Sequence, residues 1–158
     1  MNEDKDLEEK CLSKRTITQE PTVTKIENKE QMKTLAEQHK NNSEYFYEAA
    51  NNLLKSSTPL VAILIAHFAM EHKANQLLAL HGYKIGSHVC SQIGLSKIAG
   101  RKDLAKKLSD IFTLRQSIGY RLTLKQSDKS KEEAEKTFDE IVQPFFEEAD
   151  KVIKEINH

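Results

Sequence analysis

The segment PLVAILIAHFAMEHKANQLLALH (residues 59–81) decides the fold, because its apolar residues cover nearly the whole circumference of a helix. A start signal precedes it: Thr58 can accept hydrogen bonds from free backbone donors, and Pro59 suits the first helical position. Gly82 is a natural stop, since glycine adopts a left-handed backbone at little cost. A helix that is apolar on all sides must be covered by other helices, so the sequence predicts a bundle with this helix at its centre.

Three more long helices and one short helix are expected around this central one. Apolar residues at helical spacing place them at residues 29–55, 88–98, 101–126 and 131–156. Five Gly and three Pro in 158 residues are too few for a chain rich in turns. The prediction is an all-α fold, an up-and-down bundle of four long helices plus one short helix.

Two irregularities are expected within these helices. The polar stretch at Asn41 and Asn42 leaves open a break in the first helix. Pro144 removes one backbone donor from the last helix, so we expect a kink near Glu140.

Residues 1–28 are polar and lack periodicity, which predicts a flexible tail before a bundle domain over residues 29–158. The chain start lacks the apolar run of a secretory signal, and residues 60–66, the longest apolar run, are too few to span a bilayer. We therefore expect a cytoplasmic protein that does not enter a membrane. Cys11 and Cys90 fit neither a metal nor a redox spacing, and we expect free thiols in a reducing compartment.

The formal net charge of zero hides an uneven distribution of charge. Residues 97–125 contain eight basic and two acidic residues, whereas residues 126–158 contain five basic and ten acidic residues. The basic stretch favours polyanions by electrostatic steering. An interpretation of equal weight is that the basic helix packs beside the acidic last helix, so that their charges neutralise each other.

Arg115 occupies a position on the apolar stripe of the basic helix. The other members of this stripe, at helical spacing, are Leu104, Leu108, Ile111, Ile118 and Leu122. A guanidinium that points inward is costly to desolvate and stays charged at any working pH. We therefore expect either a cleft or subunit interface at Arg115, or a buried ion pair that neutralises it.

Residue spacing indicates neither metal chemistry nor nucleophilic catalysis. A di-iron or zinc bundle needs a Glu-x-x-His motif from each of two facing helices, or histidines three or four apart on facing helices. The sequence supplies neither set, so we expect no metal and no cofactor. His67 and Glu71 are four apart and share a helix face, where a polar cluster in or beside the core is their expected role. Cys90 and His88 are two apart, so they do not face each other on a helix.

The segments AHFAMEHKANQLLALHGYKIGSH (residues 66–88) and RQSIGY (residues 115–120) resemble the HEPN domain family of prokaryotes. The first has the histidine-rich central helix, the Gly-Tyr exit and the Ser-His pair that are frequent in that family. The second is similar to the family's Arg-x4-Tyr segment. The resemblance covers residues 44–156 and implies a homodimer of helical bundles, with Arg115 lining a cleft at the dimer interface.

The resemblance does not extend to the ribonuclease motif of the family, in which histidine follows arginine after four to six residues. At that distance from Arg115 stand Tyr120, Arg121 and Leu122. A phenol with a pKa of about 10 is a poor replacement for an imidazole that moves protons near neutral pH. The histidine of a ribonuclease site would have to come from elsewhere in the chain, such as His88 or His81.

Three functions remain open on these observations. The first is a non-catalytic, dimeric HEPN-type module that binds nucleotide or RNA. Its expected ligand contacts are Arg115, Tyr120, Arg121 and Lys107, and the polar cluster near its cleft comprises His67, Glu71 and His88. The second is a metal-independent ribonuclease toxin with a variant site that uses Arg115 and Tyr120. The third is a purely structural or dimerisation role, with Arg115 in a salt bridge to an acidic residue such as Glu71.

The expected partners come mainly from the resemblance. HEPN proteins are often encoded beside a small nucleotidyltransferase, which in some systems adenylylates a motif tyrosine. The resemblance therefore implies a toxin–antitoxin pair with such a protein, and Tyr120 stands at the acceptor position. A homodimer is also expected from composition, because the apolar helices exceed what the polar helices of so short a chain can cover.

Overall fold

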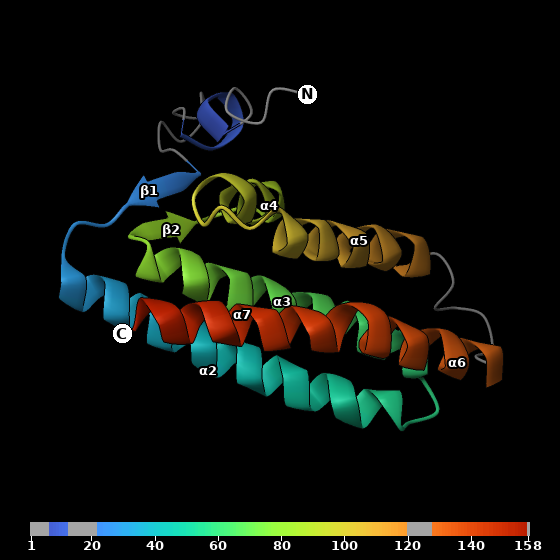
Figure 1. Cartoon of the computed structure of the whole chain (residues 1–158). Helices are drawn as coiled ribbons and strands as arrows, with labels where there is room; N and C mark the ends of the chain where they lie inside the picture. The colour runs from blue at the N-terminus through green and yellow to red at the C-terminus, as the bar shows by residue number, and fades with distance from the viewer. Residues whose placement is uncertain (1–6, 13–21, 120–127, 158) are drawn as a thin grey trace.

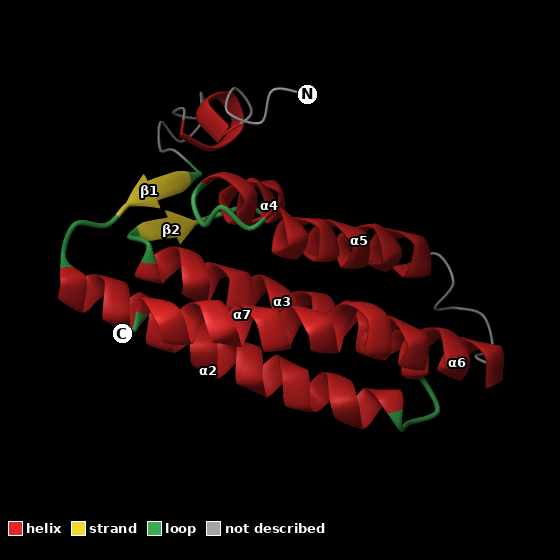
Figure 2. Ribbon diagram, viewed as in Figure 1, coloured by secondary structure: helices red, strands yellow, loops and turns green. Residues whose placement is uncertain are grey.

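The structure is a computed structural model that describes residues 7–12, 22–119 and 128–157, and it confirms the all-α helical bundle (Figure 1). The helices in chain order are η1 (Leu7–Leu12), α2 (Lys29–Leu54), α3 (Pro59–Leu80), α4 (His88–Lys97), α5 (Lys102–Gly119), α6 (Asp128–Thr137), η2 (Phe138–Val142) and α7 (Gln143–Ile156), of which η1 and η2 are π-helical. Two short strands are β1 (Val23–Lys25) and β2 (Tyr83–Ile85). Figure 2 shows them near α4, at the end of the bundle opposite α6.

The central helix of the bundle is α3, as its apolar circumference predicts. It contacts α2, α4, α5, α6 and α7, and Pro59 opens it as expected. Gly82 follows its C-terminal cap with a φ of +90°, a backbone conformation that favours glycine. Fully buried side chains of α3, among them Ile63, Met70 and Leu77, join the inner faces of α5 and α7 in one core. Within the described residues, neither α3 nor another helix has the length and apolarity that a bilayer crossing requires.

The helix α2 runs without the break that its polar middle left open. Asn28 caps it, because the side-chain oxygen accepts hydrogen bonds from the amides of Glu30 at 2.9 Å and Gln31 at 3.2 Å. Ser43, in the polar stretch, is fully buried and donates a hydrogen bond to the carbonyl of Ala69 on α3 at 2.8 Å. A small polar side chain thus lets α2 pack closely against the central helix.

The last helix contains the irregularity that Pro144 predicts. The α-helices α6 and α7 are joined by the π-helical segment η2, which includes Glu140. Proline has no amide hydrogen to donate to the carbonyl four residues before it, and the amide of Gln143 instead reaches back five residues to the carbonyl of Phe138. The disturbance is therefore a wider turn around Glu140.

The inward stripe of α5 has the expected members. Leu104, Leu108, Ile111 and Ile118 are buried. Arg115, on the same stripe, is half-buried. Leu122 and the predicted C-terminal part of this helix lie outside the described residues, which reach Gly119 at this point.

The pairing of β1 with β2 is a difference from the sequence prediction. The two strands are antiparallel, with Val23 opposite Ile85 and Lys25 opposite Tyr83. Strands of three residues show no usable alternation of apolar and polar positions, and the partner strand is distant in sequence. Residues 22–28 and η1 were predicted to be part of a flexible tail, and the structure instead folds both against the bundle.

The expectation of free thiols is wrong. Cys11 of η1 and Cys90 of α4 form a disulfide, with Cα atoms 5.7 Å apart. This Cα separation lies within the ordinary range for disulfides. Because 79 positions separate the two residues, their proximity depends on the path of the chain through β1 and β2, and residue spacing does not reveal it.

Candidate functional site

Arg115 points from α5 toward α3, which is the inward direction that the stripe predicts. Its guanidinium carbon lies 4.9 Å from the centre of the Phe68 ring, and its Nη1 donates a hydrogen bond to Nδ1 of His67 at 3.2 Å. A guanidinium over an aromatic face is attracted by the negative charge of the ring face. The aromatic ring and the imidazole thus hold Arg115 in place without neutralising its charge.

The protonation of His67 follows from this contact. Arginine can only donate, so Nδ1 of His67 must be an acceptor, and the proton of the neutral ring is on Nε2. His67 is fully buried, and burial, the Arg115 charge and His88 together lower its pKa to about 3. His67 is therefore neutral near pH 7. Its Nε2 faces Oε2 of Glu71 at 3.4 Å, one helical turn along α3, and has no closer partner among the described residues.

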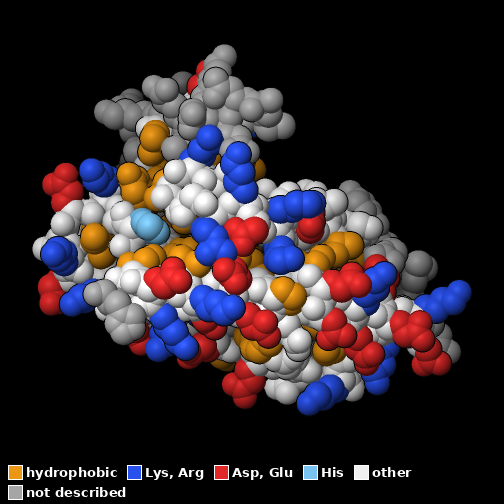
Figure 3. All heavy atoms as spheres, in the orientation of Figure 1, with side chains coloured by type: hydrophobic (Ala, Val, Ile, Leu, Met, Phe, Trp, Pro, Cys, Tyr) orange, Lys and Arg blue, Asp and Glu red, His pale blue; other side chains and the backbone are white. Residues whose placement is uncertain are grey.

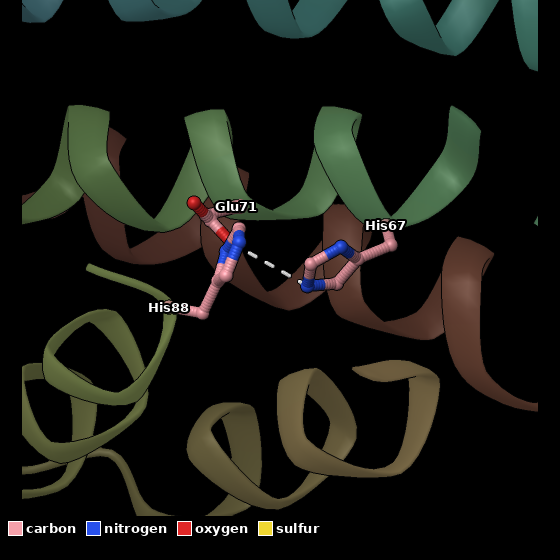
Figure 4. Close-up of side chains that lie close together, drawn as sticks. All are labelled: His67, Glu71 and His88. Atoms are coloured by element: carbon pink, nitrogen blue, oxygen red, sulfur yellow. Dashed lines mark hydrogen bonds and ion pairs between the residues drawn. The ribbon is translucent and has the colours of Figure 1, made fainter. Parts of the chain in front are cut away.

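His88 completes the cluster from a different helix. Its Nδ1 contacts Oε2 of Glu71, so that this carboxylate oxygen lies between two imidazoles (Figure 4). His67 and Glu71 come from α3, whereas His88 is the first residue of α4. The cluster predicted from His67, Glu71 and His88 is thus a chain of contacts that begins at Arg115.

The start of α4 is fixed so that His88 reaches α3. Ser87 caps the helix, because its Oγ accepts a hydrogen bond from the amide of Cys90 at 3.1 Å. Ser91 donates to the side-chain oxygen of Asn75 on α3 at 2.7 Å, and both residues are buried. Farther along α4, Gly94 lies against Leu78: an added Cβ would come within 2.9 Å of the Leu78 side chain. The chain therefore needs glycine there for the two helices to approach closely.

The cluster has the residue types of a metal site, but its hydrogen bonds oppose one. One ligand atom from each of His67, Glu71 and His88 lies within 4.8 Å of the others. A metal at Nε2 of His67 would require the proton to move to Nδ1, which faces the guanidinium of Arg115. Metal-binding histidines instead direct their second nitrogen at an acceptor such as a carboxylate or carbonyl. We therefore interpret the cluster as a support for Arg115 and His88.

A cleft of about 820 Å³ opens beside the cluster. The residues that line it are His88, Phe112, Arg115, Gln116, Ser117 and Gly119. The His88 side chain is 42% exposed, and within the described residues its Nε2 makes no hydrogen bond. The ring centre of Phe112, which also lines the cleft, is 5.5 Å from that of His67 and 5.6 Å from that of His88. The cleft thus combines a cation, an imidazole and an aromatic face.

The remaining predicted site residues lie elsewhere. Lys107 is half-buried on α5 and does not line the cleft. Tyr120 and Arg121 lie outside the described residues. His81, the alternative source of a histidine, caps the C-terminus of α3 and does not line the cleft either. Of the two histidines proposed from sequence, the structure brings His88 to Arg115.

Sequence reasoning missed Phe68, Phe112, Gln116 and Ser117. Phe112 precedes Arg115 by three residues, a spacing that places two side chains on one helix face, so this signal was present. Phe68 offered no such signal, because its contact with Arg115 crosses from α3 to α5.

Two of the basic residues before Arg115 have carboxylate partners, and one of them, Arg101, pairs with the acidic last helix, which agrees in part with the second interpretation of the charge distribution. Nη2 of Arg101, just before α5, lies 2.7 Å from a carboxylate oxygen of Asp103 and 2.7 Å from one of Glu148 on α7. These hydrogen bonds raise the pKa of Arg101 and lower that of Asp103. Lys106 pairs with Asp110 at 3.2 Å. Arg115 differs, because none of the ion pairs between described residues includes it.

A second cleft, of about 990 Å³, lies between α2, α3 and α7. Its charged lining residues are Lys33, Lys40, Lys73 and Lys154 against Glu37, Glu44, Glu147 and Asp150. The buried Lys73 pairs with Asp150 at 3.0 Å. Figure 3 shows basic and acidic side chains interspersed over the face formed by α2 and α7. With its charges balanced in this way, the second cleft offers no net attraction for a polyanion.

No family model, curated protein or solved structure matches this chain.

Proposed function

We propose that the protein is a HEPN-like helical module that binds nucleotide or RNA through the cleft at Arg115. The observation that carries the proposal is the guanidinium of Arg115, which is half-buried, lines an open cleft and is held by neutral side chains. Guanidinium groups match the geometry of phosphate, with which they form paired, charge-assisted hydrogen bonds.

The electrostatics of the cluster support a phosphate ligand. His67, which is neutral, separates the guanidinium from the carboxylate of Glu71. Glu71 in turn contacts His88, so its oxygen is engaged away from Arg115. The positive charge of Arg115 is therefore available to a ligand, unlike that of Arg101, which two carboxylates neutralise.

The rest of the cleft suits a nucleotide. The aromatic ring of Phe112 offers a face on which a base can stack. Gln116 and Ser117, both exposed at the cleft, supply hydrogen-bonding groups that tolerate different ligands. Electrostatic attraction and stacking bind single-stranded RNA with little sequence preference.

The proposal includes a homodimer whose interface closes the cleft, and a small nucleotidyltransferase as the partner of a toxin–antitoxin pair. Tyr120, the residue proposed to accept adenylate, lies outside the described residues. We also propose a cytoplasmic location, where RNA is abundant. The disulfide between Cys11 and Cys90 stands against a permanently reducing location, because such bonds are rare there except as transient or sensing bonds.

The test is the affinity of the purified protein for a labelled single-stranded RNA and for ATP, measured by fluorescence polarisation over a range of salt. Arg115→Gln should weaken binding by roughly tenfold or more, since one charge-assisted contact contributes about 1.5–3 kcal/mol. Lys106→Gln is the matched control: it removes one charge from the same helix at a side chain that is 77% exposed. Equal affinities of Arg115→Gln and wild type would contradict the proposal.

A ribonuclease is the second candidate, favoured by one observation. His88 lines the same cleft as Arg115, and Glu71 holds its Nδ1, leaving Nε2 to face a ligand. A carboxylate that orients an imidazole is a frequent arrangement in general acid–base catalysis. This site would supply, from α4, the histidine that the Arg115 segment lacks.

The ribonuclease hypothesis predicts RNA cleavage in the presence of a metal chelator, with a pH dependence set by an imidazole. His88→Ala and Arg115→Ala should each reduce the rate by about 100-fold or more. His72→Ala is a control, because the side chain of His72, on α3, contacts His39 of α2 and does not line the cleft. RNA that stays intact after long incubation with the wild-type protein would contradict the ribonuclease hypothesis and leave RNA or nucleotide binding as the proposed function.

A further inference from the structure

Cys11 and Cys90 are the two cysteines of the chain, and the structure bonds them across 79 positions of sequence. Their side chains are 0% and 1% exposed. They lie in a small apolar cluster, separate from the main core, with Val23, Leu78 and Ile85. The disulfide therefore fastens the N-terminal segment η1 to the first turn of α4.

The described side chains of η1 differ in burial. Among the four residues of this segment whose side chains are described, Cys11 is buried, while Glu9, Lys10 and Leu12 are exposed. Leu12, a large apolar side chain, is 44% exposed. Exposed side chains gain little free energy from packing, so the disulfide adds a covalent attachment to the contacts that η1 makes with α4.

We propose that Cys11 and Cys90 form a reversible dithiol–disulfide pair, a redox latch that docks η1 on α4 when oxidised and releases it when reduced. Its co-reactants are thiol–disulfide compounds such as the glutathione couple or a protein dithiol. A disulfide in a protein of a reducing compartment is usually transient and redox-sensing.

The fold keeps the two thiols close enough for the bond to form again. The pairing of Val23 with Ile85 holds the chain shortly after Cys11 against the chain shortly before Cys90. The backbone of this pairing is hydrogen-bonded without sulfur atoms, and next to it the Gly86 amide donates to the Thr22 carbonyl at 2.8 Å. Cys11 is 12 positions from Val23 and Cys90 is five positions from Ile85, so the pairing tethers the two thiols and raises the effective concentration of one at the other.

The position of Cys90 favours thiol chemistry. Cys90 lies in the first turn of α4, and its amide donates to the Ser87 cap. The positive end of a helix dipole stabilises a thiolate, which is the form that attacks a disulfide. Since the bonded sulfurs are buried, an external thiol reaches them when the residues packed around the bond open locally, so this local opening limits the rate of reduction.

The reaction balances as thiol–disulfide exchange. The thiolate of the reductant attacks one sulfur of the Cys11–Cys90 bond, which breaks and gives a mixed disulfide and one protein thiolate. A second thiol of the reductant resolves the mixed disulfide, and the second protein thiolate leaves. Two electrons and two protons pass from the dithiol to the cysteines, and the reductant ends as a disulfide.

The disulfide also lies close to the candidate functional site. His88, which lines the Arg115 cleft, lies in the same helical turn as Cys90. Release of η1 removes a contact from this turn and loosens the position of His88 relative to Glu71. This consequence rests on the proposed function of the cleft, whereas the latch itself does not.

The experiment equilibrates the full-length protein with glutathione buffers of graded redox poise. Two readouts are taken on the same samples: free thiols by alkylation and mass spectrometry, and amide hydrogen exchange by peptide. Reduction is expected to expose two thiols and to speed amide exchange in η1 by roughly tenfold or more, because local opening governs exchange. Return to an oxidising buffer should restore both readouts.

The control is the double variant Cys11→Ser and Cys90→Ser, which should exchange like the reduced protein in every buffer. Three results would overturn the proposal: thiols that stay free in the oxidising buffers, a bond that stays closed in the most reducing buffer, or unchanged exchange in η1 after reduction. RNA affinity measured in both redox states tests the link to the cleft. Absence of RNA binding in both redox states counts against the proposed function. The proposal of a redox latch is then tested by the thiol and hydrogen-exchange measurements alone.

Discussion

Two arginines lie near opposite ends of α5, Arg101 just before its first residue and Arg115 close to Gly119, and the groups that surround them differ. Arg101 lies between the carboxylates of Asp103 and Glu148, both at 2.7 Å. Arg115 lies between the Phe68 ring and the neutral imidazole of His67. In the first arrangement the carboxylates neutralise the arginine, and its ion pair with Glu148 joins the start of α5 to α7. The second holds the side chain in place and leaves its charge for a ligand, which makes Arg115 the candidate for function.

The largest expected effect is a loss in the free energy of unfolding at acidic pH, which should come from the Arg115 end of α5 and not from the Arg101 end. Because the pKa of His67 is lowered to about 3, the native state binds fewer protons there than the unfolded state, and stability falls as the pH drops from about 6.5 toward 3. The loss at pH 4 is roughly 3 kcal/mol from His67. Urea unfolding at pH 7 and pH 4 measures it, with His67→Gln as the variant that keeps an acceptor for Arg115 but does not titrate.

Wild type must be compared with His67→Gln, because other histidines with a lowered pKa also reduce the stability of the protein in acid. Burial lowers the pKa of His39 to about 4 and also lowers that of His72, which shares a hydrogen bond with it. Wild type should therefore lose more stability than His67→Gln between pH 7 and pH 4. The pair of Arg101 with Asp103 should change less over this range, since its hydrogen bond to Arg101 lowers the pKa of Asp103 below the ordinary value. Equal losses in both proteins would show that His67 is not held neutral.

A smaller effect on stability distinguishes a ligand-binding Arg115 from a structural one. Arg115→Ala removes one hydrogen bond to a neutral partner and one contact with an aromatic face, so it should cost about 1 kcal/mol. The cost would be about 3–5 kcal/mol if the change left a buried counter-charge unpaired. Thermal unfolding reports the difference, with an expected Tm shift of roughly 2–4 °C. A Tm shift several times larger would indicate that Arg115 has a purely structural role.

The extent to which sequence predicts this molecule follows from the range of each interaction. Helix bounds are set by local signals, such as Pro59 before α3 and Pro144 in the last helix, and these were predicted closely. The inward direction of Arg115 was also predictable, because a stripe of apolar residues continues on both sides of it. Local patterns therefore suffice for what happens within one helix.

Contacts between distant segments do not follow from residue spacing within one helix, although His88 was expected near the cleft with His67 and Glu71. His88 reaches Glu71 because the chain reverses at Gly82, forms β2 and starts α4 at Ser87, a path that single residues do not specify. The disulfide of Cys90 depends on the same path and on the pairing of β1 with β2. The two features that most affect the functional interpretation thus arise from tertiary structure.

The most direct test of the central claim compares the two arginines in one binding experiment. The affinity for single-stranded RNA is measured for wild type, Arg115→Gln and Arg101→Gln at several salt concentrations. We predict that Arg115→Gln loses roughly tenfold or more in affinity and about one unit of the salt-dependence slope, while Arg101→Gln stays within about twofold of wild type. Equal effects of the two variants, or no RNA binding by wild type at low salt, would contradict the account.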